Sequence, residues 1–373
     1  MPEHIYSKEN LIQKFDGILN KTFEQIDYVG MFNHIHEEDF NLQKGIAGAV
    51  IEQSVLGYPP DTKQEADLII IDDNERKDTE LKVTGMRITK NGSPHFVAKE
   101  PMSITAVGIY DLAEQTFYNS HFWNKLEHML IVYYHYLSDH AVTSYEYKDF
   151  PIKGYEFHEF NQEDERTLRY DWFYVHDLVA DIVKKYPGPK DKEWKEKVKQ
   201  EYLDRHGSLR RFLSYIDLAP KFPPRFRLKK PTVNTIIAKH FGYELEQLPG
   251  RYTTVSDVDK KCQELQKQFA GKTIGEIADL FDVPQITNSG NENKSIAEQI
   301  TVKMFGGNAK KLNKIELFER FGLIAKSVAV TPAGGRTEDM KLYHIDFEEM
   351  MQESVTEDDG TIRPFTFEDS ELY

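Results

Sequence analysis

The chain has 373 residues, of which 39% are hydrophobic and 12% aromatic, enough for ordinary cores and more typical of two domains than of one. Its net charge of −15 argues against a simple nucleic-acid-binding protein, because such a chain as a whole repels phosphate. No apolar run is long enough to span a membrane, and the first residues do not have the pattern of a signal peptide. The single cysteine, Cys262, excludes an internal disulfide and a cysteine-based zinc knuckle, and it favours a reducing cytoplasm.

The periodicity of the first two thirds predicts helices and strands in alternation. Capping residues, glycines and prolines set the limits of the helices, and apolar runs between polar turns set those of the strands. The predicted helices cover residues 8–26, 45–56, 164–185, 194–204 and 233–241. The predicted strands cover residues 66–71, 80–88, 103–110 and 129–136, with a long polar hairpin turn over 72–78.

Leu248-Pro249-Gly250 is the predicted domain boundary, and beyond it the order of elements repeats. Helices are predicted over 255–269, 273–280 and 294–305, followed by a strand over 323–330. Lys294-Ser295-Ile296-Ala297 aligns with Lys44-Gly45-Ile46-Ala47, and Ile324-Ala325-Lys326 aligns with Glu80-Leu81-Lys82. This pattern indicates a diverged internal duplication. The alternative is a chance likeness between short helices.

The second copy has apolar residues where the first has acids. Val302 stands opposite Glu52, Ile324 opposite Glu80, and Leu317 takes the place of the acid before the strand. Without carboxylates this copy cannot hold Mg2+. We therefore predict a catalytic domain over residues 1–247 and a partial, catalytically degenerate binding or allosteric domain over residues 248–373.

Asp67 and the Glu80-Leu81-Lys82 stretch form the most informative motif. Glu80 and Lys82 lie two residues apart on a predicted strand, so their side chains point to the same face. With Asp67 alongside, two carboxylates can hold a divalent cation such as Mg2+, and the lysine can orient a water and stabilise a phosphate under attack. The alternative for Glu-x-Lys alone is an ordinary solvated strand face.

Basic residues gather in one segment although the whole chain is acidic. Interleaved aromatic residues such as Phe212 and Phe226 can anchor this segment, which favours phosphate contacts over a solvated basic loop. The residues predicted to bind DNA are Lys44, Arg210, Arg211, Lys221, Arg225, Arg227, Lys229 and Lys230.

Other patterns carry less information. His34 and His36 precede three acids and resemble a metal cluster, but alternate histidines on a loop are more often simply exposed. The chain has no Walker signature, no dinucleotide-binding glycine fingerprint and no nucleophile elbow.

Taken in order, several segments resemble the MutH-type endonucleases, which comprise the mismatch-repair nicking enzyme and the two-copy restriction enzymes of the Sau-three-A type that act at GATC. Lys44-Gly45-x-x-Gly48-x-x-x-Glu52 resembles the active-site helix of that family, and Asp67 with Glu80-Leu81-Lys82 resembles its Asp…Glu-x-Lys core. Three further segments resemble later parts of the family: Ser120-His121 with Lys125-Leu126, Arg166-x-Leu168-x-x-Asp171-Trp172, and Phe226-Arg227-Leu228-Lys229-Lys230 continued by 236–241.

The resemblance implies a fold and a set of roles. The fold is α/β (α+β), a restriction-endonuclease-like central mixed sheet flanked by helices, and the activity is Mg2+-dependent cleavage of duplex DNA. Asp67 and Glu80 would be metal ligands, and Lys82 would position the attacking water. Glu52 would support the metal or a water on the base side, and Lys125 would contact the site or the scissile phosphate. The degenerate copy would bind DNA allosterically, as the inert copy does in two-copy relatives.

Three functions follow as hypotheses. The first is a cytoplasmic type II restriction endonuclease with GATC as the leading target, acting as a homodimer or a DNA-looping assembly beside a cognate DNA methyltransferase. The second is a nicking enzyme activated by mismatch-repair partners. The third is a non-catalytic DNA-binding protein, which the complete Asp67, Glu80 and Lys82 set disfavours.

Overall fold

The computed structural model describes residues 4–35, 45–58, 66–89, 94–138, 142–209, 212–219, 222–243, 245–324, 333, 335, 347–351, 353–356 and 362–365. Lys44, Arg210, Arg211, Lys221 and most of the predicted strand over 323–330 therefore lie outside the described residues, as does the alignment of Ala325-Lys326 with the catalytic motif.

Two compact units divide the chain. Unit 1 comprises residues 1–161, 218–227 and 345–373, and unit 2 comprises residues 162–217 and 228–344. The duplication and its boundary near residue 248 stay predictions.

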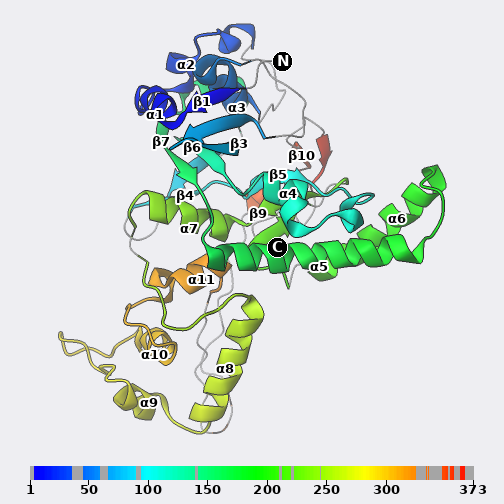
Figure 1. Ribbon diagram of the computed structural model, residues 1–373. Coiled ribbons are helices and arrows are strands. Elements are labelled where there is room, and N and C mark those ends of the chain that lie inside the picture. Colours follow the sequence, from blue (N-terminus) through cyan, green and yellow to red (C-terminus); the bar gives the residue numbers. More distant parts are fainter. Residues whose placement is uncertain are drawn as a thin grey trace. The chain divides into compact units, whose positions relative to one another are not determined.

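Unit 1 is built on a mixed sheet with the strand order β1-β2-β3-β6-β7, and β4 pairs with β3 (Figure 1). The β1/β2 and β3/β6 pairs are parallel, whereas the other pairs are antiparallel. This sheet and its flanking helices confirm the predicted fold class. The strands are β1 (Ile5–Ser7), β2 (Leu68–Asp72), β3 (Glu75–Ile88), β4 (Phe96–Ala98), β6 (Met129–His135) and β7 (Ile152–His158).

Helices α1 (Lys8–Asp16), α2 (Phe23–Ile26) and α3 (Ile46–Val50) pack on one face of this sheet (Figure 1). The predicted single helix over 8–26 is two helices, because α1 ends at Gly17, and Thr22 starts α2 with a capping box. Leu11 and Phe15 of α1 and Val50 of α3 are fully buried against strand residues such as Leu68 and Leu81. Burial of this apolar surface is the main stabilising term for the unit.

The predicted helix over 45–56 changes its winding halfway. After α3, residues Ile51–Leu56 form a π-helical segment, η2, that ends at Gly57 in the left-handed conformation (φ 85°). A residue without a Cβ adopts this conformation at little cost, which explains the helix stop.

The β2–β3 hairpin has a two-residue turn, not the long turn that was predicted. Asp73 and Asn74 have φ values of 48° and 68°, the positive values that a type I′ turn requires and that Asp and Asn tolerate. The strands then pair from Asp72↔Glu75 to Leu68↔Thr79. Continuing the register by one residue places Asp67 opposite Glu80.

A smaller sheet has the strand order β5-β9-β8, formed by β5 (Met102–Ala106), β8 (Ile216–Leu218) and β9 (Arg225–Leu228). In unit 1, α4 (His121–Asn124) precedes β6, and Phe122 of α4 packs on Phe226 of β9 with ring centroids 4.8 Å apart. The remaining short elements are η1 (Met31–His34), η3 (Leu112–Glu114), η4 (Phe117–Asn119), η5 (Tyr145–Asp149), α12 (Phe347–Met350), β10 (Ser354–Thr356) and β11 (Ile362–Pro364).

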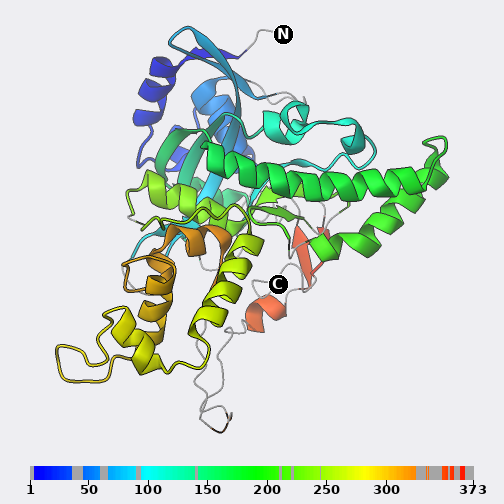
Figure 2. The ribbon, with the colours of Figure 1, turned by 60° about the horizontal axis from the view of Figure 1, so that its bottom comes forward.

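Unit 2 is mainly helical. Its long helix α5 (Gln162–Lys185) and α6 (Lys192–Arg205) lie side by side as a helical hairpin (Figures 1 and 2), with Arg205 of α6 2.8 Å from Asp181 of α5. Within the described chain no helix is long and apolar enough to cross a bilayer. The other helices are η6 (His206–Leu209), α7 (Lys230–His240), α8 (Val255–Phe269), α9 (Ile274–Leu280), α10 (Ile296–Met304), η7 (Leu312–Lys314) and α11 (Glu316–Phe321).

A buried carboxylate organises the middle of unit 2. Asp171 of α5 is fully buried, and its two oxygens accept the backbone N–H groups of Ser214, Tyr215 and Ile216 at 2.6–2.9 Å. The motif that resembled a later helix of the family is thus a structural anchor, which fixes the entry of the chain into β8.

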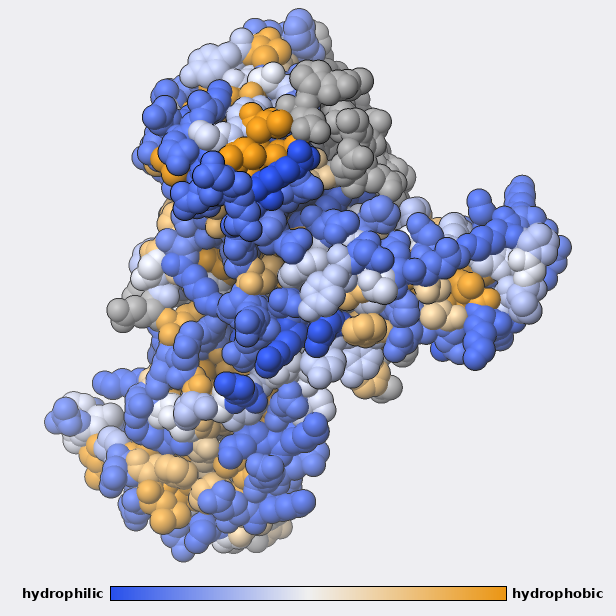
Figure 3. Space-filling model, viewed as in Figure 1, coloured by the Kyte–Doolittle hydropathy of each residue, from blue (hydrophilic) through white to orange (hydrophobic). Residues whose placement is uncertain are grey.

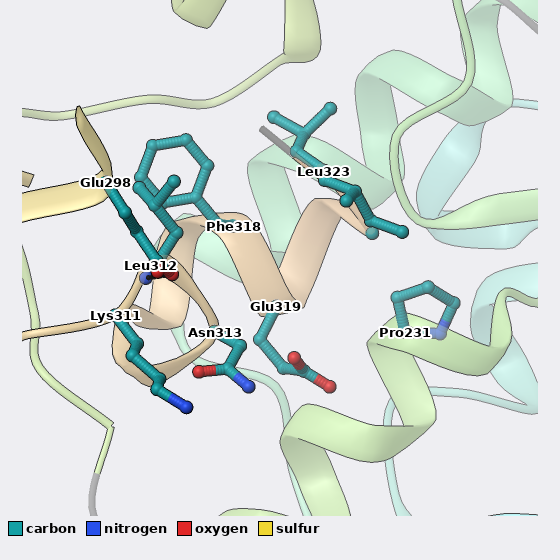
Figure 4. Close-up of a pocket in the computed structure, with 10 residues that line it drawn as sticks. Pro231, Glu298, Lys311, Leu312, Asn313, Phe318, Glu319 and Leu323 are labelled. Carbon is teal, nitrogen blue, oxygen red and sulfur yellow. Dashed lines mark hydrogen bonds between the residues drawn. The ribbon is translucent and has the colours of Figure 1, made fainter. Parts of the chain in front are cut away.

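Two surface features of unit 2 have no link to the predicted catalytic motif. Apolar side chains are exposed at Ile274, Leu280 and Ile286, and hydrophobic atoms gather over α9 and α10 in Figure 3. A cavity of about 450 Å³ has Leu312, Phe318 and Leu323 on its apolar wall and polar side chains such as Lys311 and Glu319 around it (Figure 4). The predicted catalytic side chains all belong to unit 1.

Candidate active site

The predicted catalytic residues come from four neighbouring segments of unit 1. Glu80 and Lys82 are two residues apart on β3, Asp67 directly precedes β2, Lys125 directly follows α4, and Glu52 lies on the π-helical segment η2. Leu81, between Glu80 and Lys82, faces the hydrophobic core. By strand alternation, Glu80 and Lys82 point to the opposite face of the sheet, as predicted.

Glu80 is the centre of the cluster. Its residue is only 4% exposed, and its two carboxylate oxygens each meet a lysine: Lys82 Nζ lies 2.9 Å from Oε1 and Lys125 Nζ lies 2.7 Å from Oε2. Both ammonium groups are themselves largely buried. The Lys82 ammonium is also 3.5 Å from the carbonyl oxygen of Ile104 on β5, a contact that the sequence did not suggest. The fold thus brings Glu80, Lys82 and Lys125 into direct contact.

Asp67 is held beside Glu80 through the backbone. Its Oδ2 accepts the N–H of Leu81 at 2.8 Å, which fixes the carboxyl group next to the Glu80 position. Burial, and secondly the negative charge of Glu80, raise the pKa of Asp67 to about 6, against the opposing effects of the Leu81 N–H, Lys125 and Lys82. Two carboxyl groups that repel each other in this way are electrostatically suited to a shared cation.

The chemistry of the donors fits a hard divalent ion, although two carboxylates alone do not complete its shell. Mg2+ is usually bound through one or two carboxylates, with water and phosphate oxygens as its other ligands. In the described part of the chain no group of three or more His, Cys, Asp or Glu residues is arranged to hold a metal. His34 is described, whereas His36 and the acids after it lie outside the described residues, so that metal hypothesis stays a prediction.

Glu52 is half-buried at the start of η2, and its carbonyl oxygen accepts the N–H groups of Gly57 and Tyr58 at 2.8 and 3.1 Å. The carboxylates of Glu52, Asp67 and Glu80, after the larger effect of burial, raise the pKa of the Tyr58 hydroxyl well above its usual range. The charges of all three acids therefore act on the Tyr58 hydroxyl. Nothing in the sequence singled it out, because a tyrosine after a helix-ending glycine is ordinary.

Half of the predicted DNA-binding residues fall within the described chain. Arg225 and Arg227 on β9 are half-buried, as are Lys229 and Lys230 at the start of α7. The Lys229 ammonium donates to the carbonyl oxygen of Leu213 at 2.6 Å, which gives this lysine a structural role. DNA contacts by these four residues stay predictions.

The segment that carries this site matches a known protein family. Residues 56–171 match the family model of the DNA mismatch repair enzyme MutH. Over these residues the chain is similar to the MutH family. The matched segment includes Asp67, Glu80, Lys82 and Lys125, and it ends at Asp171.

This match confirms the resemblance drawn from the sequence and supports a DNA endonuclease of restriction or mismatch-repair type, with DNA as its substrate. Glu52, the basic residues after position 204 and the predicted second copy all lie outside the matched segment. A search of curated proteins found no match to the chain.

Proposed function

We propose that the protein is a Mg2+-dependent, site-specific endonuclease that hydrolyses phosphodiester bonds in double-stranded DNA. One observation carries the proposal. Within the MutH-matched segment, Glu80 contacts both Lys82 and Lys125 on one sheet face, and Asp67 is held at the neighbouring backbone position. A mixed cluster of carboxylates and ammonium groups in a largely buried place suits a reaction at an anionic phosphate.

Each side chain has a role that its surroundings favour. Asp67 and Glu80 hold the cation, which when bound polarises the phosphate and the attacking water. Lys82 orients the water that attacks phosphorus and stabilises the negative charge that develops on the phosphate oxygens. Lys125 contributes a second positive charge at the same carboxylate, and Glu52 supports the site from η2. In the net reaction a P–O bond to the water oxygen forms, the P–O bond to the leaving sugar oxygen breaks, and the leaving oxygen takes up the proton that the water loses.

The finer parts of the proposal come from the family resemblance. GATC is the proposed target, and the enzyme is of type II restriction, acting in the cytoplasm beside a cognate methyltransferase. Arg225, Arg227, Lys229 and Lys230 are proposed to contact DNA phosphates. A symmetric target favours either a homodimer or one chain that brings two sites together, with residues 248–373 as an allosteric DNA-binding domain.

The family description supports a second candidate, because the matched model is that of a mismatch repair enzyme. In that case the chain nicks one strand, and only when partner proteins activate it.

Incubation of the purified full chain with plasmid DNA and Mg2+ separates these candidates. Discrete double-strand fragments whose ends map to GATC support the restriction enzyme. Nicked circles that appear only with mismatch-repair proteins support the second candidate. Intact plasmid under both conditions would overturn the nuclease proposal.

A further inference from the structure

Tyr58 presents a buried hydroxyl that the fold itself does not use. The residue is 7% exposed, and its ring stacks on that of His4 with centroids 4.2 Å apart at 29°. The hydroxyl oxygen is buried and has no hydrogen-bond partner among the described residues. An unsatisfied buried hydroxyl costs about 1–3 kcal/mol. Phenylalanine would pack equally well without that cost, so the hydroxyl calls for an explanation.

The backbone joins Tyr58 directly to Glu52. Both Gly57 and Tyr58 donate their N–H groups to the Glu52 carbonyl oxygen, and this double contact ends the π-helical segment η2. Such π-helical turns are uncommon and occur frequently at functional sites. Glu52 lies at the start of this π-helical segment, and Tyr58 is the second residue after its end.

Negative charges act on the Tyr58 hydroxyl. Glu52, Asp67 and Glu80 lie near enough for their charges to act on it, and Tyr6, whose own hydroxyl donates to the Leu56 carbonyl at 2.9 Å, is also close. Burial and negative charge both favour the neutral phenol over the phenolate. The hydroxyl is therefore a neutral hydrogen-bond donor that feels the charges of three carboxylates but donates to none of them.

We propose that Tyr58 is a positioning residue of the cation site, whose hydroxyl donates a hydrogen bond to the oxygen ligands around the cation held by Asp67 and Glu80. The inference rests on the proposed function, because it needs that cation site. Partners that orient metal ligands commonly change metal affinity by 10- to 100-fold when they are removed. The buried hydroxyl is then the donor, and an oxygen ligand of the cation would be its acceptor.

The test is Tyr58→Phe in the full chain, with two readouts that need no catalysis. Mn2+ binding is measured by titration calorimetry without DNA, and the melting temperature is measured without metal. We expect Mn2+ affinity to fall about tenfold, while the metal-free melting temperature stays the same or rises because a buried unsatisfied hydroxyl has been removed.

Tyr155→Phe is the matched control. The Tyr155 hydroxyl donates to Asp16 at 2.8 Å, and its ring packs with Phe15 of the hydrophobic core. Its removal should leave Mn2+ affinity unchanged and lower the melting temperature slightly, the reverse of the pattern expected for Tyr58→Phe.

Unchanged Mn2+ affinity in Tyr58→Phe would overturn the inference and leave the nuclease proposal intact, provided that the wild type binds Mn2+ and cleaves DNA. A clear fall in the metal-free melting temperature would also overturn it, because the hydroxyl would then serve the fold. If the wild-type protein binds no Mn2+, both the inference and the proposed cation site are wrong.

Discussion

The ammonium of Lys125 lies 2.7 Å from Oε2 of Glu80, although the two residues are 45 positions apart in the sequence. Since Lys82 occupies the other oxygen of Glu80, each half of this buried carboxylate has its own positive partner. Lys125→Met should therefore leave one buried oxygen without a partner and lower the free energy of unfolding by about 1–3 kcal/mol. It should also slow DNA cleavage by about 100-fold, as the loss of one preorganised donor typically does.

Urea unfolding of Lys125→Met, Glu80→Gln and the double variant measures the coupling free energy between Lys125 and Glu80. Because the residues touch, the two losses should not add. Lys77→Met is the control, since the more exposed pair between Lys77 of β3 and Glu159 should contribute at most about 1 kcal/mol. If the double variant loses as much unfolding free energy as the two single variants together, the contact between Lys125 and Glu80 is contradicted.

Asp67 should make the metal-free protein less stable above pH 6. Its pKa is raised from 3.8 to about 6 in the fold, so the ionised carboxylate is disfavoured there and this destabilisation disappears as pH falls through about 6 toward 4. Asp67→Asn keeps an oxygen that can accept the Leu81 N–H. The variant should be more stable than the wild type at pH 8, by up to about 3 kcal/mol, and equal to it near pH 4.

Chemical unfolding at several pH values, in the presence of a chelator, measures that difference. The variant should not cleave DNA at any pH, because it lacks one of the two proposed cation ligands. If Asp67→Asn is less stable than the wild type by the same amount at pH 8 and pH 4, then Asp67 serves packing, and its negative charge does not destabilise the fold.

Asp171 should be essential for the fold of unit 2. Its carboxylate accepts the N–H groups of Ser214, Tyr215 and Ile216, so Asp171→Ala leaves three buried donors without partners. We expect a loss of more than about 3 kcal/mol in the free energy of unfolding. Asp177→Ala, at an exposed position on the same helix, should change it by less than about 0.5 kcal/mol. Equal effects of the two substitutions would remove the anchoring role.

The salt dependence of DNA binding should reveal the phosphate contacts of the basic residues. Arg227→Ala should weaken binding to all duplexes and reduce the slope of log affinity against log salt by about 1. Lys229→Ala should do the same and also lower stability, because Lys229 bonds the Leu213 carbonyl. Fluorescence anisotropy at several salt concentrations gives the slope, with Lys197→Ala on α6 as the control. An unchanged slope in Arg227→Ala would place that residue away from DNA.

Strand alternation predicted that Glu80 and Lys82 share one face, whereas Lys125 was predicted only from the family resemblance. The sequence predicted most helices and the strands β2, β3 and β6, but not β1, β4 and β7 of the same sheet. It missed the tight β2–β3 turn, since the exposed end of that hairpin is polar and looks like a loop. The Asp73-Asn74 pair was the available signal. It also missed Tyr58, whose importance depends on the acids that tertiary structure brings around it.

The most direct test of the account is the single-turnover cleavage rate of a GATC-containing duplex in Mg2+ by the wild type, Lys82→Ala and Lys77→Ala. Both lysines are on β3, but Lys77 pairs with Glu159 and Lys82 with Glu80. We predict that the wild type and Lys77→Ala cleave at similar rates and that Lys82→Ala is slower by about 100-fold or more. Cleavage by Lys82→Ala at the wild-type rate would contradict the assignment of this sheet face as the active site.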